Sequence, residues 1–75
     1  MTDSELIAIK TFAEIRDPQA TSRRFSQLPQ RKQGDKARDM VKDYLSRHNE
    51  DMTKNSIGRA ANHLNRLINE QRRKI

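Results

Sequence analysis

The stretch TKNSIGRAANHLNRLINEQR, residues 53–72, decides the fold of this chain. Its apolar residues recur at spacings of three and four, which is the pattern of an α-helix with one apolar face. Thr53 stands just before that pattern and is a good N-cap, because its hydroxyl oxygen can accept a hydrogen bond from a free backbone N–H. The stretch therefore predicts a long helix over about residues 54–72. The predicted apolar face consists of Ile57, Ala60, Ala61, Leu64, Leu67 and Ile68.

The same spacing upstream predicts a second core helix over about residues 36–48, with Asp35 as its cap. Before it, the segment LPQRKQGD, residues 28–35, holds Pro29 and Gly34 among polar residues. Such punctuation is typical of a loop, and we predict that this loop is the only hinge of the chain. The apolar face of the helix consists of Ala37, Met40, Val41, Tyr44, Leu45 and His48.

Two shorter helices are predicted near the N-terminus. The first covers about residues 4–16, because Thr2 and Glu5 have the spacing of a capping box. The second covers about residues 18–28, since Asp17 is a suitable cap and Pro18 is tolerated at the first helical position. Their apolar faces are Leu6, Ile9, Phe12 and Ala13 in the first helix, and Thr21, Phe25 and Leu28 in the second.

Length and composition restrict the fold to one small domain. The chain has 75 residues, of which 32% are apolar and 35% are charged. A domain of this size has a thin core and is marginally stable without a partner or a ligand. We predict an all-α fold, a small bundle of three to four helices. It comprises an acidic helix over residues 4–16, a basic helical part over residues 18–72 and a frayed tail over residues 73–75.

The charge is unevenly distributed along the chain. The net charge is +6, but residues 1–20 hold two bases and four acids, a net of −2, and the remaining residues carry +8. This asymmetry is expected if the basic part faces a polyanion. The chain contains no cysteine, and its N-terminal stretch has neither the apolar run of a signal peptide nor a membrane span. We expect a cytoplasmic protein, associated with the nucleoid if it binds DNA, with no membrane partner.

The polar face of the helix at residues 54–72 is the best candidate for a functional site. It presents amide and guanidinium groups together, and these groups pair bidentately with adenine and guanine in the major groove. The predicted nucleic-acid-binding residues are Lys54, Asn55, Arg59, Asn62, His63 and Arg66. Among them, Asn55 and Arg59 are expected to recognise bases, and Lys54 and Arg66 to hold phosphates. The alternative is an ordinary amphipathic helix whose polar face is merely solvated.

Within this region, MTKNSIGRAANHL, residues 52–64, resembles the turn and second helix of helix-turn-helix DNA-binding proteins. The resemblance implies that the helix after Thr53 is a recognition helix for duplex DNA. The upstream part departs from that motif, which has a small residue and a glycine where this chain has Arg47 and Asp51. The longer stretch DYLSRHNEDMTKNSIGRAANHLNRL, residues 43–67, is similar to the helical DNA-clasping segment of phage-type integrases.

Further bases outside that helix are candidates for supporting phosphate contacts, which require only positive charge held at the surface. Any single pair of them is equally expected on a solvated surface, but their collective excess favours attraction to a polyanion. The predicted supporting residues are Arg23, Arg24, Arg31, Lys32, Arg72 and Arg73.

The residues do not predict catalysis. His48 and His63 are the only histidines, and His48 ends an apolar face, where a capping or core role is expected. We predict no catalytic residue, no metal site and no cofactor, because a metal site needs three or four convergent ligands. Asp39 and Asp43 are expected to form surface ion pairs with nearby bases.

These patterns predict a small non-catalytic DNA-binding protein with a regulatory or architectural role. The alternative is a protein-interaction adaptor or inhibitor, which would dock its basic surface on an acidic patch of a larger enzyme. Ile7 and Ile15 lie off the predicted apolar face of the first helix. This split pattern suggests that the acidic helix packs in a homodimer or against a protein partner and does not contact nucleic acid.

Overall fold

The computed structural model describes residues 1–74, without the side chains of Arg73 and Lys74. The helices are α1 (Asp3–Ala13), α2 (Pro18–Ser26), α3 (Gln30–Arg47) and α4 (Lys54–Glu70), followed directly by the 3-10 helix η1 (Gln71–Lys74). Strands are absent from this part of the chain. The predicted fold class, an all-α bundle of three to four helices, is therefore confirmed. Of the tail that was expected to fray, residues 73–74 are part of η1, and Ile75 lies outside the described residues.

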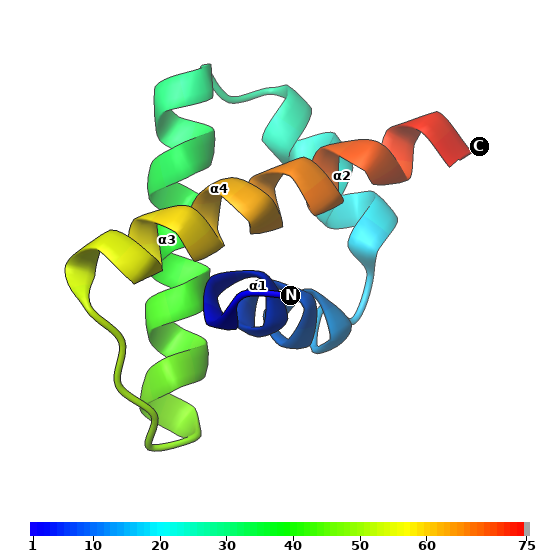
Figure 1. Cartoon of the computed structure of the whole chain (residues 1–75). Coiled ribbons are helices and arrows are strands. Elements are labelled where there is room, and N and C mark those ends of the chain that lie inside the picture. Colours follow the sequence, from blue (N-terminus) through cyan, green and yellow to red (C-terminus); the bar gives the residue numbers. More distant parts are fainter. Residues whose placement is uncertain (75) are drawn as a thin grey trace.

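The central element is α4, which contacts α1, α2 and α3 and crosses α3 in Figure 1. Its predicted apolar face forms the middle of the core, since Leu64 and Ile68 have no solvent-exposed surface. The face predicted for the second core helix is buried too, with Val41 fully enclosed and Met40 partly so, except at its last residue, His48, which is exposed. The cluster that these helices share consists of Ile7, Ala8, Phe25, Ala37, Val41, Tyr44, Leu45, Ala60, Ala61, Leu64 and Ile68.

Three helices begin at the predicted caps. The backbone N–H of Glu5 donates to the hydroxyl oxygen of Thr2 over 3.2 Å. In the same way, the backbone N–H of Ser56 donates to the hydroxyl oxygen of Thr53 over 3.2 Å. At α2, the carboxylate of Asp17 accepts from the N–H of Ala20 over 3.1 Å. Each side chain satisfies a donor that the helix itself leaves free, and the prediction from these cap residues is confirmed.

The predicted loop over residues 28–35 is wrong, because α3 begins at Gln30 and contains both Gly34 and Asp35. The side-chain amide of Gln33 explains the early start. Its Nε2 donates to the backbone carbonyl oxygens of Phe25, over 2.7 Å, and Leu28, over 3.0 Å, at the end of α2. These bonds hold the first turn of α3 against α2 and offset the cost of a helical glycine. Asp35 is therefore not a cap, and the expected hinge is a helical turn.

The prediction for the first helix is wrong in two respects: α1 ends at Ala13, and the opposite face is buried. The core side consists of Ser4, Ile7, Ala8 and Thr11. Burial is possible because the hydroxyl of Thr11 donates to the carbonyl oxygen of Ile7 over 2.7 Å, and that of Ser4 donates to the carbonyl oxygen of Ser56 over 3.2 Å. Small side chains with satisfied hydroxyls let α1 approach α4 closely.

Candidate nucleic-acid interface

A cleft of about 530 Å³ lies between α3 and the first half of α4. On the α3 side it is lined by Arg38 and Lys42, which are one helical turn apart. No acidic side chain lines it. We call this site the α3–α4 cleft, and its lining residues are Arg38, Lys42, Lys54, Asn55, Ile57, Gly58, Arg59 and Asn62.

The four bases of the cleft form no ion pair with the residues that the structure describes. The ion pairs of the described chain lie outside the cleft. Glu14 pairs with Arg47 over 2.8 Å and with His48 over 2.7 Å, and Asp43 pairs with Arg47 over 3.1 Å. Unpaired charges of one sign on a concave surface reinforce one another and attract a polyanion. The α3–α4 cleft therefore has the electrostatics of an anion-binding surface.

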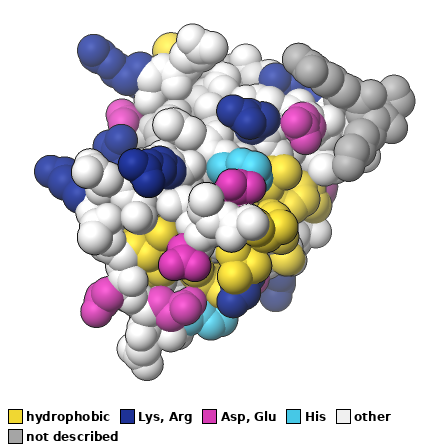
Figure 2. All heavy atoms as spheres, in the orientation of Figure 1, with side chains coloured by type: hydrophobic (Ala, Val, Ile, Leu, Met, Phe, Trp, Pro, Cys, Tyr) yellow, Lys and Arg dark blue, Asp and Glu magenta, His cyan; other side chains and the backbone are white. Residues whose placement is uncertain are grey.

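A second hollow, of about 410 Å³, lies between the N-terminal end of α1 and the middle of α4. Arg59 and Asn62 line both sites, so the two adjoin along α4. Figure 2 shows most of the visible Lys and Arg side chains in the upper and left parts of the view and a hydrophobic patch at the lower right, with acidic side chains in both parts. We call this second hollow the α1–α4 hollow, and its lining residues are Thr2, Ser4, Glu5, Arg59, Asn62, His63 and Arg66.

All of the recognition residues predicted on α4 lie along this surface. Lys54 and Asn55 line the α3–α4 cleft, and His63 and Arg66 line the α1–α4 hollow. Arg59 and Asn62 line both. The helical spacing of these residues placed them on one face correctly, and all of them except His63, which is half-buried, are exposed.

Sequence reasoning did not assign Arg38 and Lys42 to the site. Their spacing of four along one helix was the available signal, but spacing within α3 says nothing about which other helix that face meets. The packing of α4 across α3 brings these two bases beside Lys54 and Arg59. The candidate site therefore has positive charge from two helices instead of one.

The predicted supporting residues do not gather with the α4 face. Arg23, Arg24 and Arg31 are exposed and line neither the cleft nor the hollow. The guanidinium of Arg72 donates to the carbonyl oxygen of Ser22 over 2.9 Å and to the side chain of Asn69 over 3.0 Å, so it links the end of the chain to α2. The side chain of Arg73 lies outside the described residues.

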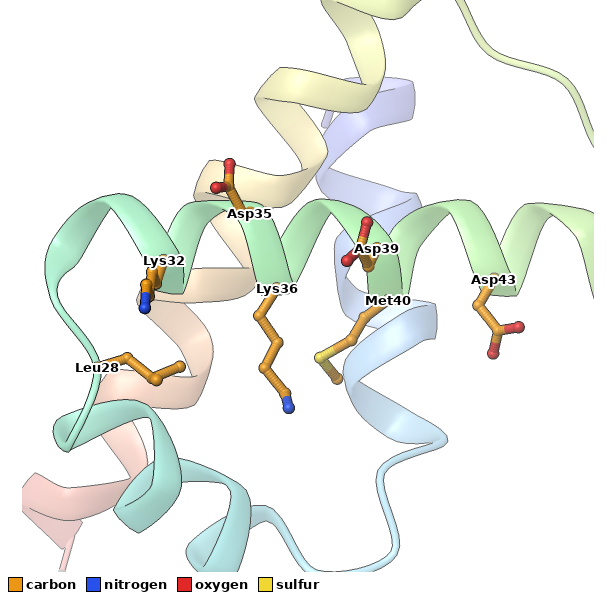
Figure 3. Close-up of a pocket in the computed structure, with 7 residues that line it drawn as sticks. All are labelled: Leu28, Lys32, Asp35, Lys36, Asp39, Met40 and Asp43. Carbon is orange, nitrogen blue, oxygen red and sulfur yellow. The ribbon is translucent and has the colours of Figure 1, made fainter.

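Lys32 lies on a different face of α3, in a shallow trough that also runs past the end of α2. Figure 3 shows Asp35 and Asp39 rising from one edge of α3, while Lys36 and Met40 extend toward the other. Acids and bases alternate here, so their fields largely cancel. We call this site the α3 trough, and its lining residues are Leu28, Lys32, Asp35, Lys36, Asp39, Met40 and Asp43.

Comparison of the chain with protein-family models, with curated proteins and with solved structures gave no match. Among residues 1–74, no three His, Asp or Glu side chains converge as metal ligands would. His48 ends α3 and stacks on the ring of Tyr44 with ring centroids 4.2 Å apart. None of the described helices is long and apolar enough to cross a membrane.

Proposed function

We propose that this chain is a non-catalytic nucleic-acid-binding protein that holds duplex DNA against α4 and the α3–α4 cleft, in a regulatory or architectural role. The observation that carries the proposal is the cleft itself, which has no acid among its lining residues and four bases that form no ion pair with the described part of the chain. Affinity for DNA arises largely from such charges, since each neutralised phosphate releases counterions.

Arg59 is the central residue of the proposed contact. It lies where the α3–α4 cleft meets the α1–α4 hollow, with Asn62 beside it. In this position it can reach a base edge, while Lys54 and Arg66 on either side of it meet the phosphates. Arg38 and Lys42 add phosphate contacts from α3.

The competing proposal is an adaptor or inhibitor whose basic surface meets carboxylates on an enzyme. The placement of apolar side chains favours DNA. The large exposed apolar residues of the described chain are Met1, Leu6 and Ile9, all at or before α1, and none lines the α3–α4 cleft. A stable protein interface usually has an apolar centre, whereas a phosphate-binding surface needs none.

The first experiment measures binding by fluorescence anisotropy to a random-sequence duplex, the matching single strand and a structured RNA, each at two salt concentrations. We expect the duplex to bind most tightly. Its affinity should fall with salt, with a logarithmic slope of roughly −0.9 for each phosphate contacted.

The second experiment compares two double variants of α3 with the same loss of charge and the same spacing. Arg38→Ala/Lys42→Ala removes two bases from the α3–α4 cleft, and Lys32→Ala/Lys36→Ala removes two from the α3 trough. We expect the cleft variant to bind duplex about tenfold or more weakly and to lose about two units of salt slope. The trough variant should change much less, because neighbouring aspartates already offset its lysines.

The third comparison separates base contacts from phosphate contacts on α4. Arg59→Ala should weaken a preferred site by about 10- to 100-fold and flatten sequence preference, whereas Arg66→Ala should weaken all duplexes alike. Equal affinity of the wild type and every variant for all nucleic acids would overturn the DNA proposal. The acidic protein surface would then be the better candidate partner.

A further inference from the structure

The outer side of α1 carries an exposed apolar stripe that the fold does not cover. Leu6 is 42% exposed and Ile9 is 39% exposed, and Ala13 continues the line as an exposed residue. At 100° per residue these three positions fall within about 60° of one another, on the side opposite the buried residues of α1. Figure 2 shows hydrophobic side chains gathered over α1 in the lower half of the view. We call this surface the outer stripe.

The outer stripe is unusual in this chain, whose mean hydropathy is −1.13. Exposed large apolar residues are concentrated there, since the only ones in the described part are Leu6, Ile9 and the neighbouring Met1. A helix that is apolar on two sides normally buries both of them. The stripe therefore requires a partner that the folded chain does not supply.

The charges beside the stripe exclude a polyanion as that partner. A small hollow of about 250 Å³ adjoins Leu6 and is lined by Asp3, Glu50 and Asp51 against one base, Lys10. Ile7 and Met52 contribute apolar surface to the same hollow. An acidic rim around apolar side chains repels phosphates and suits a protein surface that supplies both an apolar side chain and a base.

We propose that the outer stripe binds a second copy of this chain, with the two α1 helices antiparallel across a two-fold axis. The evidence is a reciprocal charge pattern. Asp3 and Lys10 lie along the same flank of the stripe, two turns apart, and neither forms an ion pair within the described chain. In a two-fold arrangement the same flank of each helix meets its own copy in reverse order, which sets acid against base.

The apolar register and the charge register agree. Stacking Leu6 on Ile9 of the second copy brings each Asp3 to within two residues of the other copy's Lys10. That offset is about 3 Å along the helix axis, well within the reach of a lysine side chain.

A short interface predicts a weak dimer. The 11 residues of α1 extend for roughly 16 Å, so the contact is small and its assembly depends on concentration. This inference rests on α1 and the hollow beside it, and it does not depend on nucleic-acid binding.

Sedimentation equilibrium over a range of protein concentrations tests the dimer. We expect the average mass to rise from 8.8 kDa toward twice that value. Leu6→Glu and Ile9→Glu should each abolish the rise, because a carboxylate would be buried against apolar groups. Gln19→Glu adds the same charge at an exposed position of α2 and should leave association unchanged. Circular dichroism checks that every variant keeps its helices.

Charge reversal tests the antiparallel arrangement. Asp3→Lys and Lys10→Asp should each weaken association severalfold, and the double variant should restore most of it, because acid again meets base. A wild type that stays monomeric up to about 1 mM would overturn the proposal. Association that survives Ile9→Glu would assign the interface to another face. A double variant as weak as the single ones would overturn the antiparallel pairing.

Discussion

The Nε2 atom of His48 lies 2.7 Å from a carboxylate oxygen of Glu14, and this contact joins the end of α3 to the end of α1. Arg47 holds the other oxygen of the same carboxylate over 2.8 Å. The hydrogen bond with His48 is the main cause that lowers the pKa of Glu14 below its ordinary value of 4.5. The charge of Arg47 lowers this pKa too, while partial burial opposes the shift.

A lowered carboxyl pKa makes stability depend on pH in one direction. The unfolded chain takes up the proton of Glu14 more readily than the folded chain, so the stabilisation is complete above pH 4.5 and is lost as the pH falls through the lowered pKa. Below pH 4.5 we expect the melting temperature of the wild type to fall more than that of Glu14→Gln, because the glutamine side chain cannot take up a proton. Thermal melts followed by circular dichroism, from about pH 7 to about pH 2, measure this.

The control for Glu14 is Glu70→Gln, which removes the same charge from a residue that forms no ion pair within the described chain. Its acid dependence should follow that of the wild type. If acidification lowers the melting temperature of Glu14→Gln as much as that of the wild type, the charge of Glu14 and its contacts with His48 and Arg47 contribute nothing to the acid dependence of stability.

Ser22 and Ser4 are both buried serines, but only one of the two hydroxyls is satisfied. The hydroxyl of Ser22 is fully enclosed and has no hydrogen-bond partner among residues 1–72, whereas that of Ser4 donates to the carbonyl oxygen of Ser56. We expect Ser22→Ala to raise the free energy of unfolding by up to about 1 kcal/mol, because an unsatisfied buried group is removed. Ser4→Ala should lower it by about 1 kcal/mol. Urea unfolding measures both, and a loss of stability in Ser22→Ala would show that its hydroxyl has a partner in solution.

The hydrogen bonds of the Gln33 side chain should contribute measurably to the free energy of unfolding. Besides its two bonds to α2, its Oε1 accepts a hydrogen bond from the amide of Asn69 over 3.2 Å, so one side chain links α2, α3 and α4. Gln33→Ala should cost about 1–3 kcal/mol of unfolding free energy and loosen the first turn of α3. The matched change Gln30→Ala, at an exposed position of the same helix, should cost little. Urea titration gives the energies, and faster amide exchange at residues 30–35 of Gln33→Ala alone would locate the effect.

The two glycines lie within helices and face open space, because a Cβ atom at Gly34 or Gly58 would meet no heavy atom within 4 Å beyond its chain neighbours and the adjacent helix backbone. Alanine at either position should raise the free energy of unfolding by about 0.5–1 kcal/mol. Only Gly58 lines the α3–α4 cleft. If a DNA backbone lies in that cleft, Gly58→Ala should weaken duplex binding severalfold while Gly34→Ala leaves it unchanged. Identical binding by both variants would mean that the ligand does not approach the floor of the cleft.

The sequence by itself determined the helices and the polar face of α4. Spacing and cap chemistry are local, so Thr2, Asp17 and Thr53 identified three helix starts without reference to any neighbour. The line of Asn55, Arg59, Asn62 and Arg66 follows from the helical repeat alone. The regular pattern of α4 left no ambiguity about which side is buried.

Tertiary structure alone decided three further features, all of which depend on contacts between helices. Both sides of α1 carry apolar residues, and the small Ser4, Ala8 and Thr11 selected the buried side because they allow close packing on α4. The early start of α3 depends on the reach of Gln33 to carbonyl groups of α2. Arg38 joined the candidate site only through the crossing of α3 and α4, since the spacing of residues within one helix does not specify how that helix is rotated against the next.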